Sequence, residues 1–270
     1  MSLKLGVIGF GNIAKAIITP LLEQNILQPE EIICLVNSRK SFENIKNNYK
    51  FKINIYHLNS PEANLVWHCP VKLLSVKPQQ LKNIKELNLN DNNKYFLISI
   101  LAGVSLKTLE TIFPKHNCIR AVTNIPITVG QGLTGIAWNN EIDDKNKIFI
   151  RNIFENSGKV FEFSEDYLDI FLALTSSAPA IVALIIDALA DGGLSGGLTK
   201  KLSKELVIDM IYGTILMIKD LNVSPSDLKD MVTSPAGTTI AALRILEKKG
   251  FRSALIEAIL GAMNKSKEFK

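Results

Sequence analysis

Along the first 164 residues, short apolar runs typical of strands alternate with stretches that have a helical pattern of apolar positions. The run Lys4 to Ile8 predicts a buried strand that ends at glycines, and the pattern from Ile13 to Leu22 predicts a helix. Further strands are predicted at residues 31–36, 52–56, 71–76, 95–101 and 118–123. Helix-capable stretches separate most of them, which is typical of an α/β protein with a parallel, doubly wound sheet. Residues 132–138 and 158–163 are expected to extend the sheet, and a polar helix beginning near Asp143 lies between them.

The pattern changes after Ser164, where long and nearly all-apolar helical stretches replace the strands. They run from Tyr167 to Leu189 and from Lys201 to Leu221. Helices that are apolar on every side need a cover, and about 105 residues make a thin domain, so a partner subunit is expected to cover them. We therefore predict an α/β domain over residues 1–164 and a helical domain over residues 165–270 that forms a homodimer.

Composition narrows the class of protein. The formal charge is +5, yet the lysines are scattered and no basic stripe is interleaved with aromatic residues, so no nucleic-acid partner is expected. Cys34, Cys69 and Cys118 lie far apart, and the three histidines are isolated, so neither disulfides nor a metal site is expected. No apolar run is judged to reach transmembrane length and no signal peptide precedes the first strand, so a cytoplasmic protein without membrane contact is expected.

A glycine-rich fingerprint follows the first predicted strand and opens the first predicted helix. It reads Gly9-Phe10-Gly11-Asn12-Ile13-Ala14. Gly9 permits a tight turn, Gly11 lets the backbone approach a pyrophosphate, and the helix N-terminus offers free amides to the anion. The strand before it and the helix after it favour dinucleotide binding over a glycine turn without a ligand.

Two further strand ends carry candidate cofactor contacts. The second strand ends at Asn37-Ser38-Arg39-Lys40 instead of the acid that NAD-preferring proteins place there, and two cations with a hydroxyl suit the 2′-phosphate of NADP. NADPH is therefore predicted over NADH. The fourth strand ends at Ser75-Val76-Lys77, at the sheet edge where ligands bind in open α/β folds. Lys77 is more often found beside a cofactor phosphate or in water than as a general acid.

Hydroxyls, small residues and a proline gather just before the predicted helix Ile240 to Leu246. The segment Thr233 to Thr239 combines a Ser-Pro turn with a helix start, which leaves amides free to bind a carboxylate. By local chemistry alone an ordinary capped helix start is the better interpretation, since Ser and Thr are preferred caps.

Taken together, these segments resemble the pyrroline-5-carboxylate reductase family over essentially the whole chain. The most specific matching run is Asp230 to Thr239. The other matching runs are Gly9 to Ile17, Val76 to Gln79, Ser99 to Glu110, Arg120 to Pro126, Ala188 to Gly193 and Leu246 to Arg252.

The resemblance implies reduction of 1-pyrroline-5-carboxylate to L-proline by NADPH, on a Rossmann-type domain followed by an all-helical dimerisation domain. It also implies a homodimer, and larger rings of dimers occur in the family. Thr239 would hydrogen-bond the ring nitrogen of the substrate, and Asn59 would lie near the adenosine ribose. The residues that it implies for substrate binding are Ser234, Gly237, Thr238 and Asn124.

One segment departs from the family pattern. Where the family has Thr-Gly-Leu-Ser-Gly-Ser-Gly-Pro-Ala, residues 172–180 read Leu-Ala-Leu-Thr-Ser-Ser-Ala-Pro-Ala, so a polar residue is lost and three glycines have gained side chains. Two alternatives to proline formation follow from this change. The chain could reduce another cyclic imine or an oxo acid, or it could be a regulatory paralogue that binds NADP without turnover.

Overall fold

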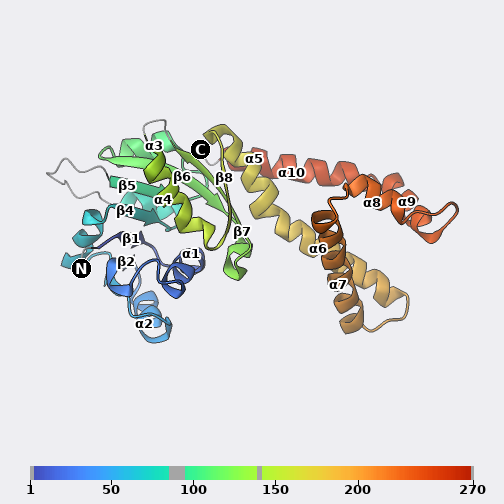
Figure 1. Cartoon of the computed structure of the whole chain (residues 1–270), viewed down its shortest axis with the longest axis horizontal. Coiled ribbons are helices and arrows are strands. Elements are labelled where there is room, and N and C mark those ends of the chain that lie inside the picture. The colour runs from blue at the N-terminus through green and yellow to red at the C-terminus, as the bar shows by residue number, and fades with distance from the viewer. Residues whose placement is uncertain (1–2, 85–94, 139–141, 269–270) are drawn as a thin grey trace. The chain divides into compact units, whose positions relative to one another are not determined.

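The computed structural model describes residues 3–84, 95–138 and 142–268. It divides into two compact units, one of residues 1–176 with 262–270 and one of residues 177–261 (Figure 1). The change from strands to helices at residue 164 therefore precedes the point where the packing changes. Residues 165–176 are helical but pack with the sheet.

The first unit is built on an eight-stranded sheet in the order β3-β2-β1-β4-β5-β6-β7-β8. The strands are β1 (Leu5–Ile8), β2 (Ile32–Val36), β3 (Asn54–His57), β4 (Val71–Leu74), β5 (Tyr95–Ser99), β6 (His116–Thr123), β7 (Gly132–Trp138) and β8 (Gly158–Glu162). The fold prediction is confirmed, because β1 to β6 are parallel neighbours and helices connect them. From β1 the chain first adds β2 and β3 on one side and then β4 to β6 on the other. At such a switch point the connections after neighbouring strands leave on opposite faces of the sheet, so a crevice forms at the carboxyl ends of β1, β2 and β4.

The last two strands run against the rest. β7 pairs antiparallel with β6, and β8 pairs parallel with β7. The prediction that these two strands extend the sheet is confirmed. The prediction of a parallel sheet does not hold for the pairing of β7 with β6. The reason for the reversal is the short connection after β6, since eight residues cannot carry the chain back for a parallel crossover.

Helices cover both faces of the sheet. One core lies under α1 (Asn12–Glu23), α2 (Arg39–Asn48) and α4 (Asp144–Glu155), and it takes the side chains of Val7 and Cys34 from the central strands. The other core lies under α3 (Leu106–Ile112), short 3₁₀ turns and α5 (Leu168–Leu172), and it takes the alternate side chains Ile8 and Leu35. Strands buried on both faces explain the continuous apolar runs in the sequence.

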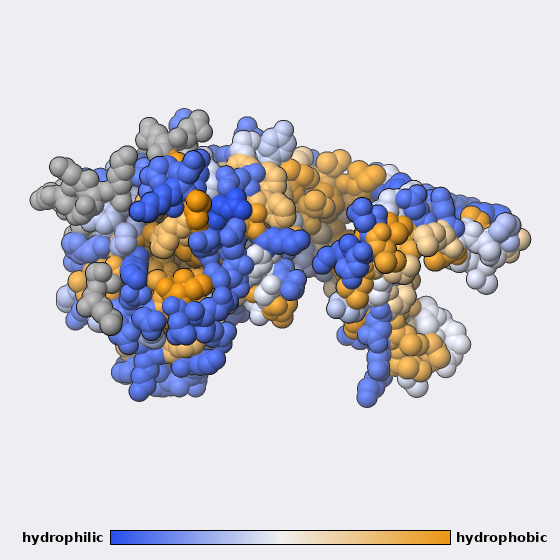
Figure 2. Space-filling model, viewed as in Figure 1, coloured by the Kyte–Doolittle hydropathy of each residue, from blue (hydrophilic) through white to orange (hydrophobic). Residues whose placement is uncertain are grey.

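The second unit is helical. Its helices are α6 (Ala178–Ser195), α7 (Lys200–Asp220), α8 (Pro225–Met231), α9 (Thr238–Lys248) and α10 (Phe251–Lys267), the last of which returns to the first unit from residue 262. Many of its apolar side chains are exposed, among them Leu184, Leu206 and Ile245. Figure 2 shows such side chains gathered over these helices on the face drawn.

The expectation about apolar runs needs a correction. Within the described residues, the helical stretch Glu165–Ser195 is long and apolar enough to cross a membrane by length and composition, with a mean hydropathy of 2.0 in its most apolar window and 17% of that window buried. The chain stays helical through Pro179, because proline is tolerated in the first turn of α6 and a π-helix (Ala173–Ser177) joins α5 to α6. An apolar helix of a subunit interface has the same length and composition, so this stretch is weak evidence of a membrane span.

Candidate functional site

The glycine turn lies where β1 ends, in the crevice between β2 and β4. Gly9 has a φ of +90°, and a Cβ at this position would lie 2.4 Å from the carbonyl oxygen of Ser75. Only glycine therefore fits between β1 and the chain after β4. Gly11 is the N-cap of α1, and no side chain caps this helix start. A Cβ at Gly11 would have no neighbouring atom within 4 Å. The first amides of α1 therefore have no side-chain cap, as an anion site requires.

A cleft of about 330 Å³ follows this turn. The carboxyl ends of β1, β2 and β4 line it, and most of the predicted cofactor residues meet there. Those residues are Gly9, Phe10, Gly11, Asn37, Ser38, Ser75, Val76 and Lys77. The lining residues that were not predicted include Ser41, Leu58 and Gln80. Chain segments from three separate strand ends thus converge on one elongated pocket.

The other predicted cofactor residues lie around the cleft. Asn12 is the first residue of α1 and lines a groove on the other side of the turn, while Ile13 packs against the core under α1. Asn59 lines an adjacent pocket that shares Ile8, Leu35 and Leu58 with the cleft. Arg39 is the exposed first residue of α2.

The residues after β2 form a helix start with a free cation. Ser38 is the N-cap of α2, and its Oγ accepts from the amide of Ser41 at 3.1 Å and donates to the Ser41 Oγ at 2.8 Å. Among the described residues no carboxylate pairs with Arg39. A phosphate at this place would meet a helix N-terminus, two hydroxyls and a guanidinium. Ser41 could have been found from its position three residues after Ser38, since an N-cap side chain binds the amide at this spacing.

Gln80 also joins the cleft through a local turn. The amide of Lys77 donates to the Gln80 Oε1 at 3.2 Å, and the 3₁₀ turn Pro78–Asn83 begins between them. This contact fixes the loop after β4. The role of Gln80 could have been predicted from the run Lys-Pro-Gln-Gln, because a proline followed two residues later by a glutamine is typical of a capped turn.

In the second unit the predicted substrate residues gather at the start of α9. The amide of Gly237 donates to the carbonyl of Ser234 at 3.1 Å, and Ala236 between them has a φ of +58°. A Cβ on Gly237 would lie 2.4 Å from the Ser234 Oγ, so the hydroxyl lies directly against the N-cap. No side chain caps α9.

The first amides of α9 are therefore open. Ser234 and Thr238 are exposed and Thr239 is half-buried. Open amides with adjacent hydroxyls can bind a carboxylate through hydrogen bonds and the positive end of the helix dipole. Local chemistry alone favoured an ordinary capped helix, and the helix has no side-chain cap.

Asn124 lies in a different environment from the other predicted substrate residues. It is 5% exposed, at the end of β6. Its Nδ2 donates to the carbonyl of Thr175 at 3.1 Å, and its Oδ1 accepts from the amide of Leu133 at 2.8 Å. Both polar atoms of the side chain thus bind backbone. Direct contact with a substrate stays a prediction for this residue.

The segment that departs from the family pattern contains the π-helix. Ala173 is fully buried, and the Ser176 Oγ donates to the carbonyl of Thr123 at 3.1 Å. The Thr175 Oγ1 donates to the carbonyl of Phe171 at 2.7 Å. Two of the side chains gained at glycine positions, those of Ala173 and Ser176, are therefore taken up by packing and by a backbone contact.

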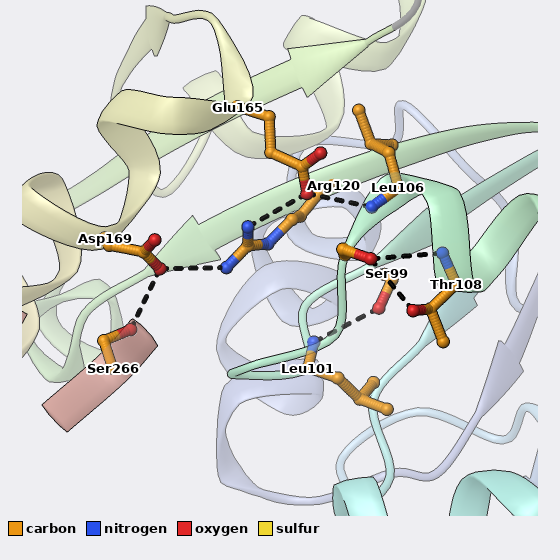
Figure 3. Close-up of polar contacts among 9 residues, drawn as sticks. Ser99, Leu101, Leu106, Thr108, Arg120, Glu165, Asp169 and Ser266 are labelled. Atoms are coloured by element: carbon orange, nitrogen blue, oxygen red, sulfur yellow. Dashed lines mark hydrogen bonds and ion pairs between the residues drawn. The ribbon is translucent and has the colours of Figure 1, made fainter. Parts of the chain in front are cut away.

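A buried arginine lies beside this segment (Figure 3). The guanidinium of Arg120 is 3.0 Å from the carboxylate of Glu165 and 3.4 Å from that of Asp169, and Asp169 accepts from the Ser266 hydroxyl at 3.0 Å. Strand β6, the start of the helical stretch and the end of α10 thus meet through charged hydrogen bonds. Removing one partner would leave a buried charge, so this network fixes how these three segments pack.

One histidine and two thiols buried in the first unit are kept neutral. Burial and, as the smaller cause, nearby Lys72 together lower the pKa of His116 to about 3. Burial raises the pKa of Cys69 to about 12 and that of Cys34 well above its usual value. These thiols are not nucleophiles at neutral pH. Among residues 3–84, 95–138 and 142–268 no group of three His, Cys, Asp or Glu side chains could hold a metal ion.

A glycine turn at the switch point of a doubly wound sheet defines a dinucleotide-binding protein of the Rossmann class. Residues 4–103 match the family model described as "NADP oxidoreductase coenzyme F420-dependent", and residues 165–269 match "Pyrroline-5-carboxylate reductase dimerisation". The chain is an NADP-dependent oxidoreductase.

Relatives identify the family. The chain is 40% identical to pyrroline-5-carboxylate reductase of Synechocystis sp. over 99% of this chain and 98% of that protein, and 31% identical to that of Arabidopsis thaliana over 99% and 95%. It also matches the solved structure of the reductase from Coxiella burnetii with a TM-score of 0.87 and 29% identity, over 99% of this chain and 98% of that one. The reductase from Plasmodium falciparum, solved with NADP bound, matches with a TM-score of 0.83 and 29% identity, over 99% and 98%. The chain belongs to the pyrroline-5-carboxylate reductase family.

Proposed function

We propose that this protein reduces 1-pyrroline-5-carboxylate to L-proline with NADPH. The observation that carries the proposal is the match to named pyrroline-5-carboxylate reductases along nearly the full length of this chain and of each relative. The chemistry of the two open helix starts agrees with it. One start accepts a pyrophosphate beside the glycine turn, and the other accepts a carboxylate beside three hydroxyl-bearing side chains.

The cofactor is expected in the cleft after the glycine turn. The residues there fit a dinucleotide, because Gly11 leaves room for the pyrophosphate and the first amides of α1 are uncapped. Ser38, Ser41 and Arg39 would hold the 2′-phosphate. When bound, NADPH supplies the hydride that reduces the C=N carbon of the substrate.

The start of α9 would hold the substrate. Ser234 and the amides near Gly237 and Thr238 would bind its carboxylate, and the Thr239 hydroxyl would hydrogen-bond the ring nitrogen. A basic imine would bind in its protonated form. When the C=N carbon gains the hydride, the C=N π electrons become the nitrogen lone pair and the nitrogen keeps its proton, so the protein needs only to orient the imine and offer a hydrogen bond.

The assembly and location are parts of the same proposal. A homodimer through the helical unit is supported by the matching dimerisation model and by the exposed apolar side chains of α6 and α7. Further association of dimers into rings would follow the family. A cytoplasmic location fits the three buried cysteines, none of which forms a disulfide in the described part of the chain, because reducing compartments keep thiols reduced.

The test is a reduction assay with purified protein. Pyrroline-5-carboxylate is mixed with NADPH or NADH, and the loss of nicotinamide absorbance is followed. We expect rapid consumption of NADPH and formation of proline. NADPH binding without consumption would contradict the proposal and favour a regulatory role, and activity only with larger cyclic imines would favour a different substrate.

A variant tests the assigned substrate site. Thr239→Ala should lower kcat about tenfold or more, because one hydrogen bond to the reacting ring is lost, while the NADPH dissociation constant stays within about twofold. Thr233→Ala is the matched control, since this hydroxyl donates to the carbonyl of Lys229 within α8. Equal loss of NADPH affinity in Thr239→Ala would refute the assignment.

A further inference from the structure

The helix that leaves the sheet contains a carbonyl that its own backbone cannot satisfy in the α-helical pattern. In an α-helix the amide four residues onward donates to each carbonyl, and the residue four positions after Thr175 is Pro179, which has no N–H. The proline ring also crowds the carbonyl four residues before it. The π-helix Ala173–Ser177 lies directly before this point and widens the turn.

Asn124 supplies the donor that Pro179 lacks. Its Nδ2 donates to the Thr175 carbonyl at 3.1 Å, and the two residues are 5% and 8% exposed. The contact is buried, so its loss is more costly than the loss of an exposed hydrogen bond would be. The two residues lie 51 positions apart, so the contact depends on the tertiary fold.

The same side chain also fixes the loop after β6. The Oδ1 of Asn124 accepts from the amide of Leu133 at 2.8 Å, which closes the loop that contains the 3₁₀ helix Ile125–Val129. That 3₁₀ helix packs against α1, the helix that begins at the glycine turn. One amide side chain therefore holds together the loop that packs against α1 and the π-helix Ala173–Ser177.

We infer that Asn124 is a positioning residue for hydride transfer, which acts by replacing the backbone donor missing at Pro179 and so holds the π-helix against the end of β6. The inference rests on the proposed function for its catalytic consequence. It adds a backbone role to the direct substrate contact predicted for Asn124, which stays a prediction.

A double-mutant cycle between residues 124 and 179 tests the inference. Asn124→Ala should lower kcat with pyrroline-5-carboxylate about tenfold or more per folded molecule, because small displacements of reacting groups are costly, while NADPH affinity stays within about twofold. Pro179→Ala restores a backbone N–H that can reach the Thr175 carbonyl, and alone it should keep kcat within about twofold. In the Pro179→Ala background, adding Asn124→Ala should lower kcat less than about threefold.

Asn156→Ala is the matched control. The Nδ2 of Asn156 also donates to a backbone carbonyl, that of Asn152 at 2.6 Å, but in an exposed position where water can replace it. It should leave kcat and the melting temperature unchanged. A purely structural contact would instead lower the melting temperature of Asn124→Ala and leave kcat per folded molecule at the wild-type level, which would overturn the inference.

The remaining outcomes also decide the matter. If Asn124→Ala does not fold, recovery of folded, active protein in the Asn124→Ala/Pro179→Ala variant supports the link, and failure of both overturns it. Equal losses of kcat from Asn124→Ala in the two backgrounds overturn it as well. A wild-type protein inactive with pyrroline-5-carboxylate would overturn the proposed function, whereas additive shifts in melting temperature across the cycle would overturn the coupling of Asn124 to Pro179.

Discussion

At the scale of single residues, the two glycines of the first turn have different tasks. Gly9 is required by the fold, because its φ is +90° and a Cβ would meet the Ser75 carbonyl at 2.4 Å. Gly11 has open space around it and an extended backbone that any residue adopts. Its smallness serves the approach of a pyrophosphate instead. The same fingerprint therefore contains one folding residue and one binding residue.

Substitution separates these tasks. Gly9→Ala should lower the free energy of unfolding by about 2–4 kcal/mol, from backbone strain and overlap with a backbone oxygen. Gly11→Ala should leave that free energy within about 0.5 kcal/mol but raise the NADPH dissociation constant about tenfold or more. Urea unfolding and fluorescence titration measure the two quantities. An unaltered NADPH affinity in Gly11→Ala would argue against a pyrophosphate at this turn.

His116 is a second residue whose environment determines its behaviour. It lies among Trp67, Tyr95 and Phe113 at the start of β6, and burial lowers its pKa to about 3. The unfolded chain binds a proton near the ordinary pKa of 6.5, and the folded protein does not. Stability from this group is therefore complete above pH 6.5 and is lost as the pH falls toward 3.

The expected slope can be measured. Between pH 6.5 and 4 the free energy of unfolding should fall with decreasing pH, with a contribution of up to about 1.4 kcal/mol per pH unit from His116. His116→Phe should make the urea-derived pH profile flatter in this range. The exposed His68→Asn serves as the control for loss of a histidine. Profiles of equal slope in wild type and His116→Phe would show that this group does not stay neutral.

At the scale of elements, the start of α2 brings the cofactor-selecting groups together. Ser38 caps the helix through the amide and hydroxyl of Ser41, and the exposed Arg39 lies between them in sequence without a carboxylate partner among the described residues. The helix start alone attracts an anion, and the guanidinium adds a paired contact. NADPH carries a phosphate at this place and NADH carries a hydroxyl, so the element should discriminate between them.

Arg39→Ala measures this discrimination. It should raise the NADPH dissociation constant about tenfold and leave the NADH value within about twofold, because only the 2′-phosphate accepts the guanidinium contact. Lys46→Ala removes a cation from the last turn of the same helix and should change neither value. A parallel loss of both affinities in Arg39→Ala would count against the phosphate contact.

At the scale of the whole molecule, the two units are stabilised in different ways. The first unit has two buried cores around its sheet, whereas the helices of the second expose large apolar side chains such as Leu206, Tyr212 and Ile215. Water contact with so many apolar side chains is unfavourable, and the dimerisation model matches this half of the chain. Stability of the protein should therefore depend on association.

Association can be tested by mass and by dilution. Light scattering should give at least twice the chain mass of 29.9 kDa, and the melting temperature should fall on dilution because dissociation accompanies unfolding. Ile215→Glu should favour the monomer and lower the melting temperature, while Lys204→Glu on the same helix should not. A wild-type monomer with a concentration-independent melting temperature would contradict the dimer.

The sequence by itself determined the elements and the residue types at their ends. Apolar periodicity predicted β7 at residues 132–138 as the structure has it, and the other strands within two or three residues. Turn chemistry identified Gly9 and Gly11, because the need for a residue without a Cβ is a local property. The start of α9 was visible as a cluster of small residues and hydroxyls, but local chemistry favoured a capped helix and the structure shows no side-chain cap.

Only the tertiary structure decided which distant groups meet. The lowered pKa of His116 cannot be deduced from its neighbours in sequence, since it depends on what packs alongside. The antiparallel direction of β7 follows from the short connection only once β6 and β7 are known to be neighbours in the sheet. The contact of Asn124 with Thr175 joins positions 51 residues apart and gives a buried backbone role to a residue for which the family resemblance implied substrate binding. Periodicity and turn preference act over a few residues, whereas burial and hydrogen-bond partners are properties of the folded chain.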